Sequence, residues 1–355
     1  MPDTEPIPLV LVVGAGASSE ARLPVGAELK VQIARSLNIQ YPDGFRMTTG
    51  DAKINEAFRI LAAQVNPRHP DINPYLRAAW RIHDAMPQAM SIDNFIDSHK
   101  EDVLVAQCGK LAITRCILRA EAQSLLYVNP SNIYNKVDFA SVGTTWFSSV
   151  FQLLTESCQR NALAQRLSRV SIVCFNYDRC IEHYLHSSLQ NYYGLSPQEA
   201  AEALSNLTIY HPYGTVGSLP WQNQRPALGF GADPSAQTLV CLSNELRTFS
   251  EGTDSQTSDI DQIRVTVASA DRLVFLGFAY HRLNMDLLLK VLEDGEQARQ
   301  TKVFGTAHGI STADVEDICA ELVNRGGISV DRTHLRNDLT CAGLIREYWR
   351  LLSIQ

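Results

Sequence analysis

The stretch PLVLVVGAGASSEARLPVG, residues 8–26, joins an apolar segment to a loop of small residues. The apolar part is typical of a strand that is buried on both faces of a parallel sheet. Gly14 and Gly16 allow the tight turn and the close backbone approach that a pyrophosphate needs. A simple strand-to-helix turn explains the same residues, and both interpretations stay open. If the loop binds phosphate, the contacts come from Gly14, Ala15, Gly16, Ala17 and Ser18.

The loop lacks two features of a redox dinucleotide site. The dehydrogenase fingerprint has a third glycine where this chain has Ser19. No predicted strand that ends in Asp or Glu follows about 20 residues later to hold a ribose. The sequence therefore disfavours hydride transfer.

Five short apolar segments with little alternation predict buried parallel strands. They are LVLVV (9–13), SIVCF (171–175), LTIY (207–210), RLVFLG (272–277) and KVFG (302–305), and ISV (328–330) is a candidate sixth. Segments with helical periodicity lie between them, at 26–37, 179–189, 281–295, 312–325 and 339–352. This alternation predicts an α/β fold with a Rossmann-like, doubly wound, mostly parallel sheet.

Residues 38–166 differ from the rest because they show long helical periodicity and no convincing strand. We interpret them as a large helical insertion within a nucleotide-binding domain formed by 1–37 and 167–355. Residues 217–260 are expected to be rich in loops. Helices are expected in and around the insertion at 54–65, 74–86, 110–128 and 144–167.

The composition indicates a globular protein. The chain has 355 residues, of which 45% are hydrophobic and 19% charged, and its formal net charge is −7. No basic stripe indicates direct nucleic-acid binding. The first residues, MPDTEPIP, lack the pattern of a signal peptide, and no apolar run approaches the roughly 20 residues that cross a bilayer. We therefore expect a cytoplasmic protein that does not enter a membrane.

The cysteines bear on metal binding. The chain has 8 cysteines, and none of them forms a CxxC pair. Structural zinc sites need such close pairs. We therefore expect reduced, mostly buried thiols and no metal.

Each of the five clear strands is followed directly by small or chemically capable residues. These segments are GAGAS (14–18), NYD (176–178), HPYG (211–214), FAYHRLN (278–284) and TAHG (306–309). Ligands of open α/β sheets bind beyond the carboxyl ends of the strands. Packing alone predicts ordinary turns at these places, so the five segments together indicate a ligand crevice.

Asn176, Asp178 and His211 are the candidates whose side chains suit catalysis. Asn176 and Asp178 follow a strand directly, and a turn residue with a helix N-cap is the simpler interpretation of that pair. His211 lies between LTIY and a proline, so it belongs to a strand end and not to a helix face. Weaker candidates, for which capping or a surface charge is the alternative, are Arg22, Tyr280, His281 and Asn284.

Taken in order, the motifs GAGASSEARLP, CFNYD, YHPYG and LGFAYHRLN resemble those of the sirtuin superfamily. They are most similar to its sirtuin-like NAD-hydrolase branch, found in bacterial anti-phage defence systems. GAGAS matches the GAGxS phosphate loop, FNYD matches QNxD at Asn and Asp, and HPYG matches the catalytic-histidine segment with two residues inserted before its glycine. Gly277 falls in the later NAD-contacting glycine loop, and Gly305-Thr306 is a looser match to the adenine-side segment. The resemblance covers about 1–37 and 168–320 and does not reach the helical insertion.

The resemblance implies that NAD⁺ is a substrate, cleaved between nicotinamide and ribose to give nicotinamide and ADP-ribose. In this assignment residues 14–18 anchor the phosphates, and Asn176 holds the ribose and positions water. Asp178 contacts the nicotinamide amide. His211 acts as general base on a ribose hydroxyl or on water, because an imidazole titrates near neutral pH. No metal is needed.

Two departures from the protein-deacylating sirtuins bear on the activity. Those enzymes carry a zinc ribbon with two close cysteine pairs, whereas residues 212–276 contain only Cys241. They also have Asp-Phe-Arg after the proline of the first loop, where this chain has Val25-Gly26 after Pro24. Both departures disfavour an acyl-lysine deacylase. A further alternative is a non-catalytic sensor, which would bind the nucleotide without destroying it.

Hydrolysis of this kind requires control, because constant NAD⁺ loss would kill the host. The amphipathic helices of 38–166 carry more apolar surface than a lid over one dinucleotide needs, which predicts a homo-oligomer, with packing inside the chain as the alternative. Members of the resembled family work with a regulatory partner such as a hexameric ATPase or an argonaute-like protein. The resemblance therefore implies low basal hydrolysis that a partner raises.

Overall fold

The computed structural model describes residues 9–133, 135–252, 259–289 and 299–354, so the segment MPDTEPIP lies outside the described residues. Among the described residues, six strands form one sheet in the order β3-β2-β1-β4-β5-β6, and each neighbouring pair is parallel. This is the strand order of a doubly wound dinucleotide-binding sheet, so the predicted fold class is confirmed. The strands are β1 (Leu9–Val13), β2 (Val170–Cys174), β3 (Thr208–Tyr210), β4 (Arg272–Leu276), β5 (Lys302–Thr306) and β6 (Thr333–Arg336).

The first five strands lie within one residue of their predicted ends, but the sixth does not lie at 328–330. Ile328 forms an isolated bridge, a 3₁₀ turn follows at Val330–Arg332, and β6 comes after it. β6 is an edge strand with one neighbour, and its four side chains are half-buried. Its sequence, THLR, therefore carries no apolar signature that the pattern could detect.

Side chains of the strands alternate between two apolar cores, one on each face of the sheet. Val10 and Phe275 belong to the first core, and Leu11 and Val274 belong to the second. The helices on the first face are α2 (Gly26–Leu37), α13 (Ile260–Ala268), α14 (Arg282–Leu288) and α15 (Thr312–Gly326). Those on the second face are α1 (Ala15–Ser18), α7 (Trp146–Thr155), α8 (Leu163–Ser168), α9 (Cys180–Tyr193), α10 (Pro197–Leu204), α16 (Cys341–Glu347) and α17 (Trp349–Leu352).

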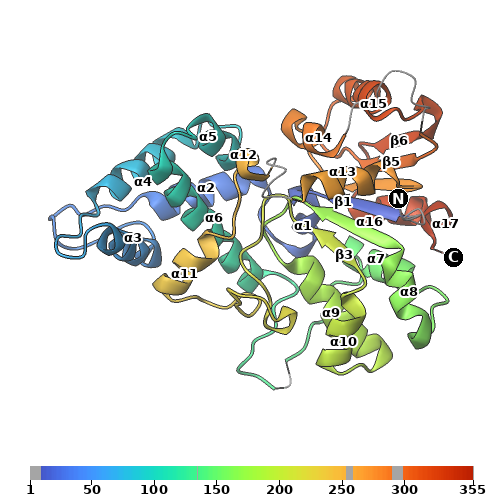
Figure 1. Ribbon diagram of the computed structural model, residues 1–355, viewed down its shortest axis with the longest axis horizontal. Coiled ribbons are helices and arrows are strands. Elements are labelled where there is room, and N and C mark those ends of the chain that lie inside the picture. Colours follow the sequence, from blue (N-terminus) through green and yellow to red (C-terminus); the bar gives the residue numbers. More distant parts are fainter. Residues whose placement is uncertain (1–8, 134, 253–258, 290–298, 355) are drawn as a thin grey trace.

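The helical insertion forms a lobe beside the sheet, on the left in Figure 1. Asp51 and Asp102 fix the starts of its two longest helices by accepting hydrogen bonds from first-turn amides. The lobe shares its apolar core with α2 and the first face of the sheet, whereas α7 and α8, at the end of 38–166, pack on the second face. The lobe helices are α3 (Ala52–Val65), α4 (Asn73–Ala85), α5 (Ile92–Ser98) and α6 (Val103–Gln123).

Residues 217–260, which we expected to be loop-rich, add a further helix to the lobe. α11 (Ala236–Ser243) begins at the Ser235 cap and packs against α3 and α6, as Figure 1 shows. The short α12 (Phe249–Gly252) lies against α5. The lobe is therefore built from two separate parts of the sequence. The second part, with α11 and α12, belongs to the segment that follows β3.

Several predicted helices differ from their patterns. The segment 339–352 divides into α16 and α17, and the helix predicted at 110–128 runs instead as α6, Val103–Gln123. The segment 144–167 divides into α7 and α8, with Ser157 between them at a φ of +52°. The predicted helix at 281–295 begins as expected, but α14 ends at Leu288, and residues 290–295 lie outside the described part of the chain.

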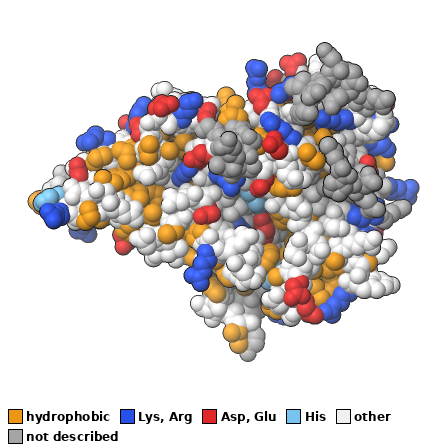
Figure 2. Space-filling model, in the orientation of Figure 1, with side chains coloured by type: hydrophobic (Ala, Val, Ile, Leu, Met, Phe, Trp, Pro, Cys, Tyr) orange, Lys and Arg blue, Asp and Glu red, His pale blue; other side chains and the backbone are white. Residues whose placement is uncertain are grey.

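The visible surface has mixed charge. Figure 2 shows basic and acidic side chains interspersed over the lobe and the sheet region, with hydrophobic side chains among them. No helix in the described ranges combines the length and the apolar character that a membrane crossing demands.

The backbone after β1 touches the backbone after β4, where the chain changes from one side of the sheet to the other. The Gly14 amide donates to the Leu276 carbonyl at 3.0 Å, and the Gly16 amide donates to the Gly277 carbonyl at 2.9 Å. A Cβ on Gly277 would lie 1.9 Å from the Ala17 nitrogen, and the φ of Gly277 is +56°. Glycine is therefore required here both for space and for backbone conformation.

We predict that Gly277→Ala destabilises the protein by more than the strain of a left-handed residue alone. Gly194, which follows α9, has a φ of +64° and open space around its Cβ position. Gly194→Ala therefore measures the strain by itself, about 1–2 kcal/mol. Gly277→Ala adds backbone overlap, so we expect a loss of about 4 kcal/mol or more in the free energy of unfolding, measured by urea denaturation. Equal losses in the two variants would contradict the close contact.

Candidate functional site

Residues from the ends of β1, β2 and β3 form one hydrogen-bonded network. It joins Ser18, Asn176, Asp178 and His211, together with the main chain of Gly14. The exposed fractions of Ser18, Asn176 and Asp178 are 3%, 7% and 4%. The parallel sheet thus brings all three predicted catalytic residues together with two members of the predicted phosphate loop.

Asn176 bridges the first two strand ends. Its Nδ2 donates to the Gly14 carbonyl at 3.1 Å and to Ser18 Oγ at 2.8 Å. The carbonyl can only accept, so the amide nitrogen must face it. Asn176 Oδ1 is then left buried without a partner among the described residues. Such an acceptor favours a donor from a ligand or from water.

Asp178 closes the same network. Ser18 Oγ donates to Asp178 Oδ2 at 2.8 Å, and the Cys180 amide at the start of α9 donates to Asp178 Oδ1 at 3.1 Å. Burial raises the pKa of Asp178 above its usual value, although both of these donors lower it in part. The N-cap position of α9 is Arg179, so Asp178 stands one residue before the cap that the simpler interpretation assigned to it, although it still accepts from the first amide of the helix. The contact with Ser18 adds a link to the glycine loop.

His211 lies between two acceptors. Its Nε2 is 2.7 Å from Glu182 Oε1 on α9, and its Nδ1 is 3.3 Å from the Asn176 carbonyl oxygen. Neither partner can donate when Glu182 is ionised, so both ring nitrogens must carry protons. The predicted base therefore has no free lone pair in this arrangement. A base role requires the loss of one of these protons.

The Glu182 carboxylate controls the charge of His211. Burial opposes a charge on the ring, but the Glu182 carboxylate first, and the Cys174 side chain after it, outweigh burial and hold the pKa of His211 well above its usual value. Burial also opposes a charge on Glu182, yet the facing imidazolium keeps the pKa of Glu182 below its usual value. Both shifts favour an ion pair between the two side chains. Glu182 is not among the residues that the motifs predict, and its one signal is its place four residues after Asp178 on a predicted helix.

Several backbone amides of the glycine loop donate hydrogen bonds to carbonyls of the protein itself. The amides of Gly14 and Gly16 bond to the segment after β4, and the Ala17 amide donates to the Gly14 carbonyl at 2.9 Å. The side chain of Ala15 is exposed, so this residue lies at the outer side of the loop. Three of the five amides that we expected to face a pyrophosphate are thus already engaged.

Gly277 and Thr306, the two later predicted contacts, touch each other. The Gly277 amide donates to Thr306 Oγ1 at 2.8 Å, and the Tyr280 hydroxyl donates to the Thr306 carbonyl at 3.1 Å. Thr306 is buried, with 3% of its surface exposed. Its hydroxyl therefore fixes the Gly277 loop in place at the switch point between β1 and β4.

Of the weaker candidates Asn284, His281 and Arg22, the first lies in a contact between two strand-end segments and the other two are exposed. Asn284 Oδ1 accepts from the Tyr213 hydroxyl at 2.5 Å, which ties the segment after β4 to the segment after β3. His281 occupies the N-cap position of α14 without a side-chain cap, and it is exposed. Arg22 is exposed and has a φ of +68°. None of these three side chains hydrogen-bonds to Asn176 or His211 among the described residues.

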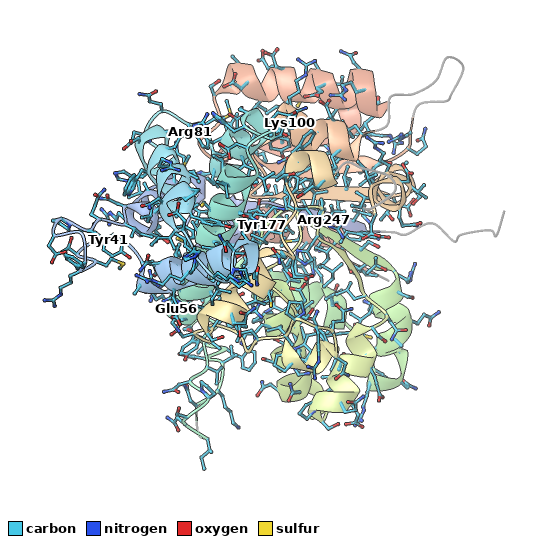
Figure 3. The ribbon with its side chains drawn as sticks, turned by 60° about the vertical axis from the view of Figure 1, so that its left-hand side comes forward. Tyr41, Glu56, Arg81, Lys100, Tyr177 and Arg247 are labelled. Atoms are coloured by element: carbon cyan, nitrogen blue, oxygen red, sulfur yellow. The ribbon has the colours of Figure 1, made fainter. Side chains whose placement is uncertain are left out.

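The lobe reaches the network through α5. The Tyr177 hydroxyl donates to Asp93, a carboxylate whose pKa burial raises. Figure 3 shows Tyr177 at the centre of the view, between the lobe and the sheet. The Phe175 ring lies 5.6 Å from the Tyr213 ring and 5.1 Å from the Phe278 ring, centre to centre. These contacts cover the ends of the strands.

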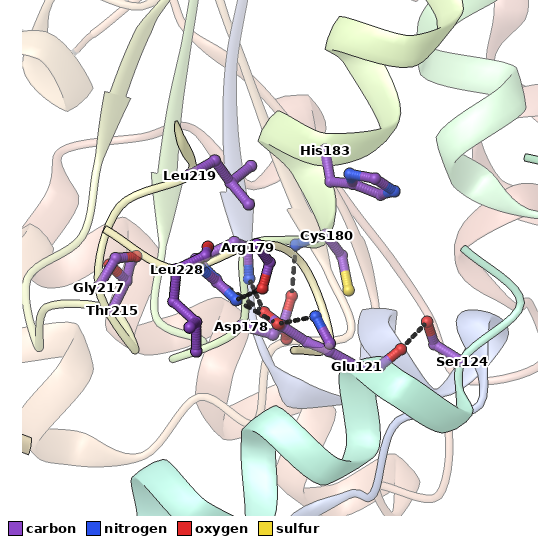
Figure 4. Close-up of polar contacts among 12 residues, drawn as sticks. Glu121, Ser124, Asp178, Arg179, Cys180, His183, Thr215, Gly217, Leu219 and Leu228 are labelled. Carbon is purple, nitrogen blue, oxygen red and sulfur yellow. Dashed lines mark hydrogen bonds and ion pairs between the residues drawn. The ribbon is translucent and has the colours of Figure 1, made fainter. Parts of the chain in front are cut away.

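Arg179, next to Asp178, anchors the network to α6 of the lobe (Figure 4). Its guanidinium donates to both carboxylate oxygens of Glu121, at 3.0 and 2.5 Å, and the exposed fractions of the two side chains are 2% and 0%. The remaining guanidinium donors reach main-chain carbonyls of the loop after β3, among them Leu228 at 2.6 Å. Glu121 also accepts from the Gly231 amide at 3.0 Å. One buried ion pair thus holds three segments together.

We predict that Arg179→Gln destabilises the protein by about 3–5 kcal/mol, because it leaves the buried Glu121 charge without its partner. Arg160→Gln is the matched control, since Arg160 pairs with Glu199 where the two side chains are 55% and 46% exposed. That surface pair should contribute about 1 kcal/mol or less. Thermal and urea unfolding measure both variants. A small effect of Arg179→Gln would show that the pair does not hold these segments.

Two hollows in the described surface lie away from the network. One of about 710 Å³ lies in the lobe and includes Arg81 and Leu104, and one of about 550 Å³ includes Tyr280 and Arg325. Neither is lined by Asn176, Asp178 or His211. No group of three or more His, Cys, Asp or Glu side chains placed to hold a metal ion is found in the part of the chain that the structure describes.

Two comparisons with known proteins gave no match. No protein-family model matches the chain, and no curated protein matches it in sequence. The likeness to the sirtuin-type motifs therefore rests on the quoted residues themselves.

Proposed function

We propose that the protein hydrolyses NAD⁺ between nicotinamide and ribose and releases nicotinamide and ADP-ribose. The observation that supports this best is the buried network around Asn176, whose Oδ1 has no partner among the described residues and lies in the same network as His211. An acceptor and a titratable ring at the end of a parallel sheet suit a ribose hydroxyl or an attacking water.

In the proposed reaction the bond to nicotinamide breaks through an oxocarbenium-like transition state. Asn176 Oδ1 would accept from the ribose or from water and so orient it. His211 would take a proton from that hydroxyl. Asp178, held by Ser18, would contact the nicotinamide amide. Positioning of this kind lowers the barrier because the reacting atoms need not find each other in solution.

The proposed activity requires the site to open. Asn176 and Asp178 are 7% and 4% exposed, so NAD⁺ reaches them only when the covering segments move. Tyr177 and Arg179 tie the same turn to the lobe through Asp93 and Glu121. We therefore propose low basal hydrolysis by a cytoplasmic homo-oligomer, raised by a regulatory protein partner such as a hexameric ATPase or an argonaute-like protein, as an NAD-depleting step in anti-phage defence.

A nucleotide sensor is the second candidate. The contacts between the lobe and the NYD turn favour it, because a ligand that displaces the turn would also displace α5 and α6. Such a protein binds NAD⁺ and leaves it intact. An NAD-dependent protein deacylase is the weaker alternative, and it would release nicotinamide only with an acylated peptide.

We predict that the purified protein releases nicotinamide from NAD⁺ and that His211→Ala lowers this rate about 100-fold or more, in the range expected for loss of a general base. His69→Ala, an exposed lobe histidine, should have no effect. Chromatography of the products, with and without a candidate partner, provides the measurement. NAD⁺ that is bound but never cleaved would instead support the sensor, and cleavage that needs an acyl-peptide would support the deacylase.

A further inference from the structure

We propose that Glu182 is the positioning residue of His211, which keeps Nε2 protonated and leaves Nδ1 as the nitrogen that exchanges a proton with the ligand. The catalytic meaning of this pair rests on the proposed function, but its geometry does not. Glu182 lies in the first turn of α9, four residues after Asp178, so the segment that follows β2 carries both a member of the Asn176 network and the partner of His211.

The two hydrogen bonds of the ring are unequal. Nε2 donates to a carboxylate at 2.7 Å, whereas Nδ1 faces a neutral carbonyl at 3.3 Å. Charge-assisted bonds are shorter and about twice as strong as neutral ones. The Nδ1 proton is therefore the first to leave. The lone pair that remains faces the Asn176 carbonyl oxygen, which cannot donate to it, so the donor must be a ligand hydroxyl or water.

The transfer of a proton to that lone pair breaks one bond and forms another. A ribose hydroxyl or water loses its proton, a new N–H bond forms at Nδ1, and the electron pair of the broken O–H bond stays on the oxygen. The imidazolium that results is stabilised by the Glu182 carboxylate. Glu182 Oε2 is buried and has no donor of its own among the described residues. The charge of Glu182 is thus directed at His211.

Other titratable groups near the pair do not replace Glu182. Cys174 on β2 interacts with His211 and also raises the pKa of the ring, but it ranks behind Glu182, and burial raises the pKa of its own thiol. Arg179 lowers the pKa of Glu182 through its charge, yet its guanidinium is bonded to Glu121. Asp178 is held by Ser18 and the Cys180 amide.

The first test is the titration of the His211 ring by NMR, with its signal assigned from a His211→Gln sample. The wild-type ring should lose its proton well above the usual histidine range. Glu182→Gln keeps the size of the side chain but removes its charge, so it should lower the pKa of His211 by about 1–3 units. Glu202→Gln, an exposed carboxylate on α10, makes the same change in net charge and should leave the titration unchanged.

The second test is the pH profile of nicotinamide release. A base must be neutral, so turnover should rise as pH passes upward through the pKa of His211. In Glu182→Gln this rise should move to lower pH, and kcat should fall about 100-fold with little change in KM. Glu182→Asp retains the charge on a shorter side chain. It should keep the rise near its wild-type pH at a reduced kcat.

These outcomes separate the two proposals. A wild-type His211 that titrates in or below its usual range would overturn the role of Glu182, whether or not any variant folds. An unshifted titration and pH profile in folded Glu182→Gln would overturn it as well. If the wild-type protein releases no nicotinamide with any partner, the proposed function fails, while the titration still decides whether Glu182 sets the charge of His211.

Discussion

The close backbone contact between the loops after β1 and β4 sets the position of everything at the candidate site. With side chains absent at Gly14, Gly16 and Gly277, two amide-to-carbonyl bonds can join the loops directly. Thr306 fixes the second loop from behind. The Gly14 carbonyl, held by this contact, is in turn the acceptor that orients Asn176. A glycine pattern that is typical of a phosphate loop thus has a packing function here. An anion at this loop could bind only to the amides that are not already bonded to the protein.

The buried charged side chains near the candidate site form pairs, and a few buried polar atoms there lack a partner among the described residues. Removing a charge from water is costly unless a partner compensates it, and Arg179 with Glu121 and His211 with Glu182 satisfy that condition. Native proteins leave few buried polar atoms unpaired. Two of the four such side-chain atoms among the described residues are Asn176 Oδ1 and Glu182 Oε2, and both belong to residues bonded to His211. Their concentration at one place makes it the candidate site for a molecule that can donate hydrogen bonds.

The sequence predicts the parts of this fold that depend on local pattern. Buried central strands such as β1 have a continuous apolar signature, and the short polar motifs after them lie at one edge because parallel strands all end there. The edge strand β6 is half-buried and polar, so no local signal marks it. α11 was missed because the Pro- and Gly-rich segment before it dominates the pattern of 217–260.

The partners of the site residues could not be predicted for a different reason. Glu182 looks like an ordinary helix charge until β3 brings His211 beside it, 29 residues later in the chain. Glu121 lies 58 residues before Arg179, in a helix assigned to the insertion. Such pairings are created by tertiary packing, and a single sequence contains no local trace of them. The motifs therefore pointed to the candidate site, while its charged partners became visible only in the fold.

The position of these partners bears on how the site could be controlled. Tyr177 and Arg179 flank Asp178 in sequence, and both are held by the lobe, one through Asp93 of α5 and the other through Glu121 of α6. The turn that carries Asn176 and Asp178 is thus fixed from the lobe as well as from the sheet. A rotation of the lobe would have to break or carry along both contacts, so the lobe cannot move without disturbing the turn. A surface that binds the lobe could in this way act on buried residues that it never touches, and the same coupling would serve a hydrolase held closed or a sensor that reports its ligand.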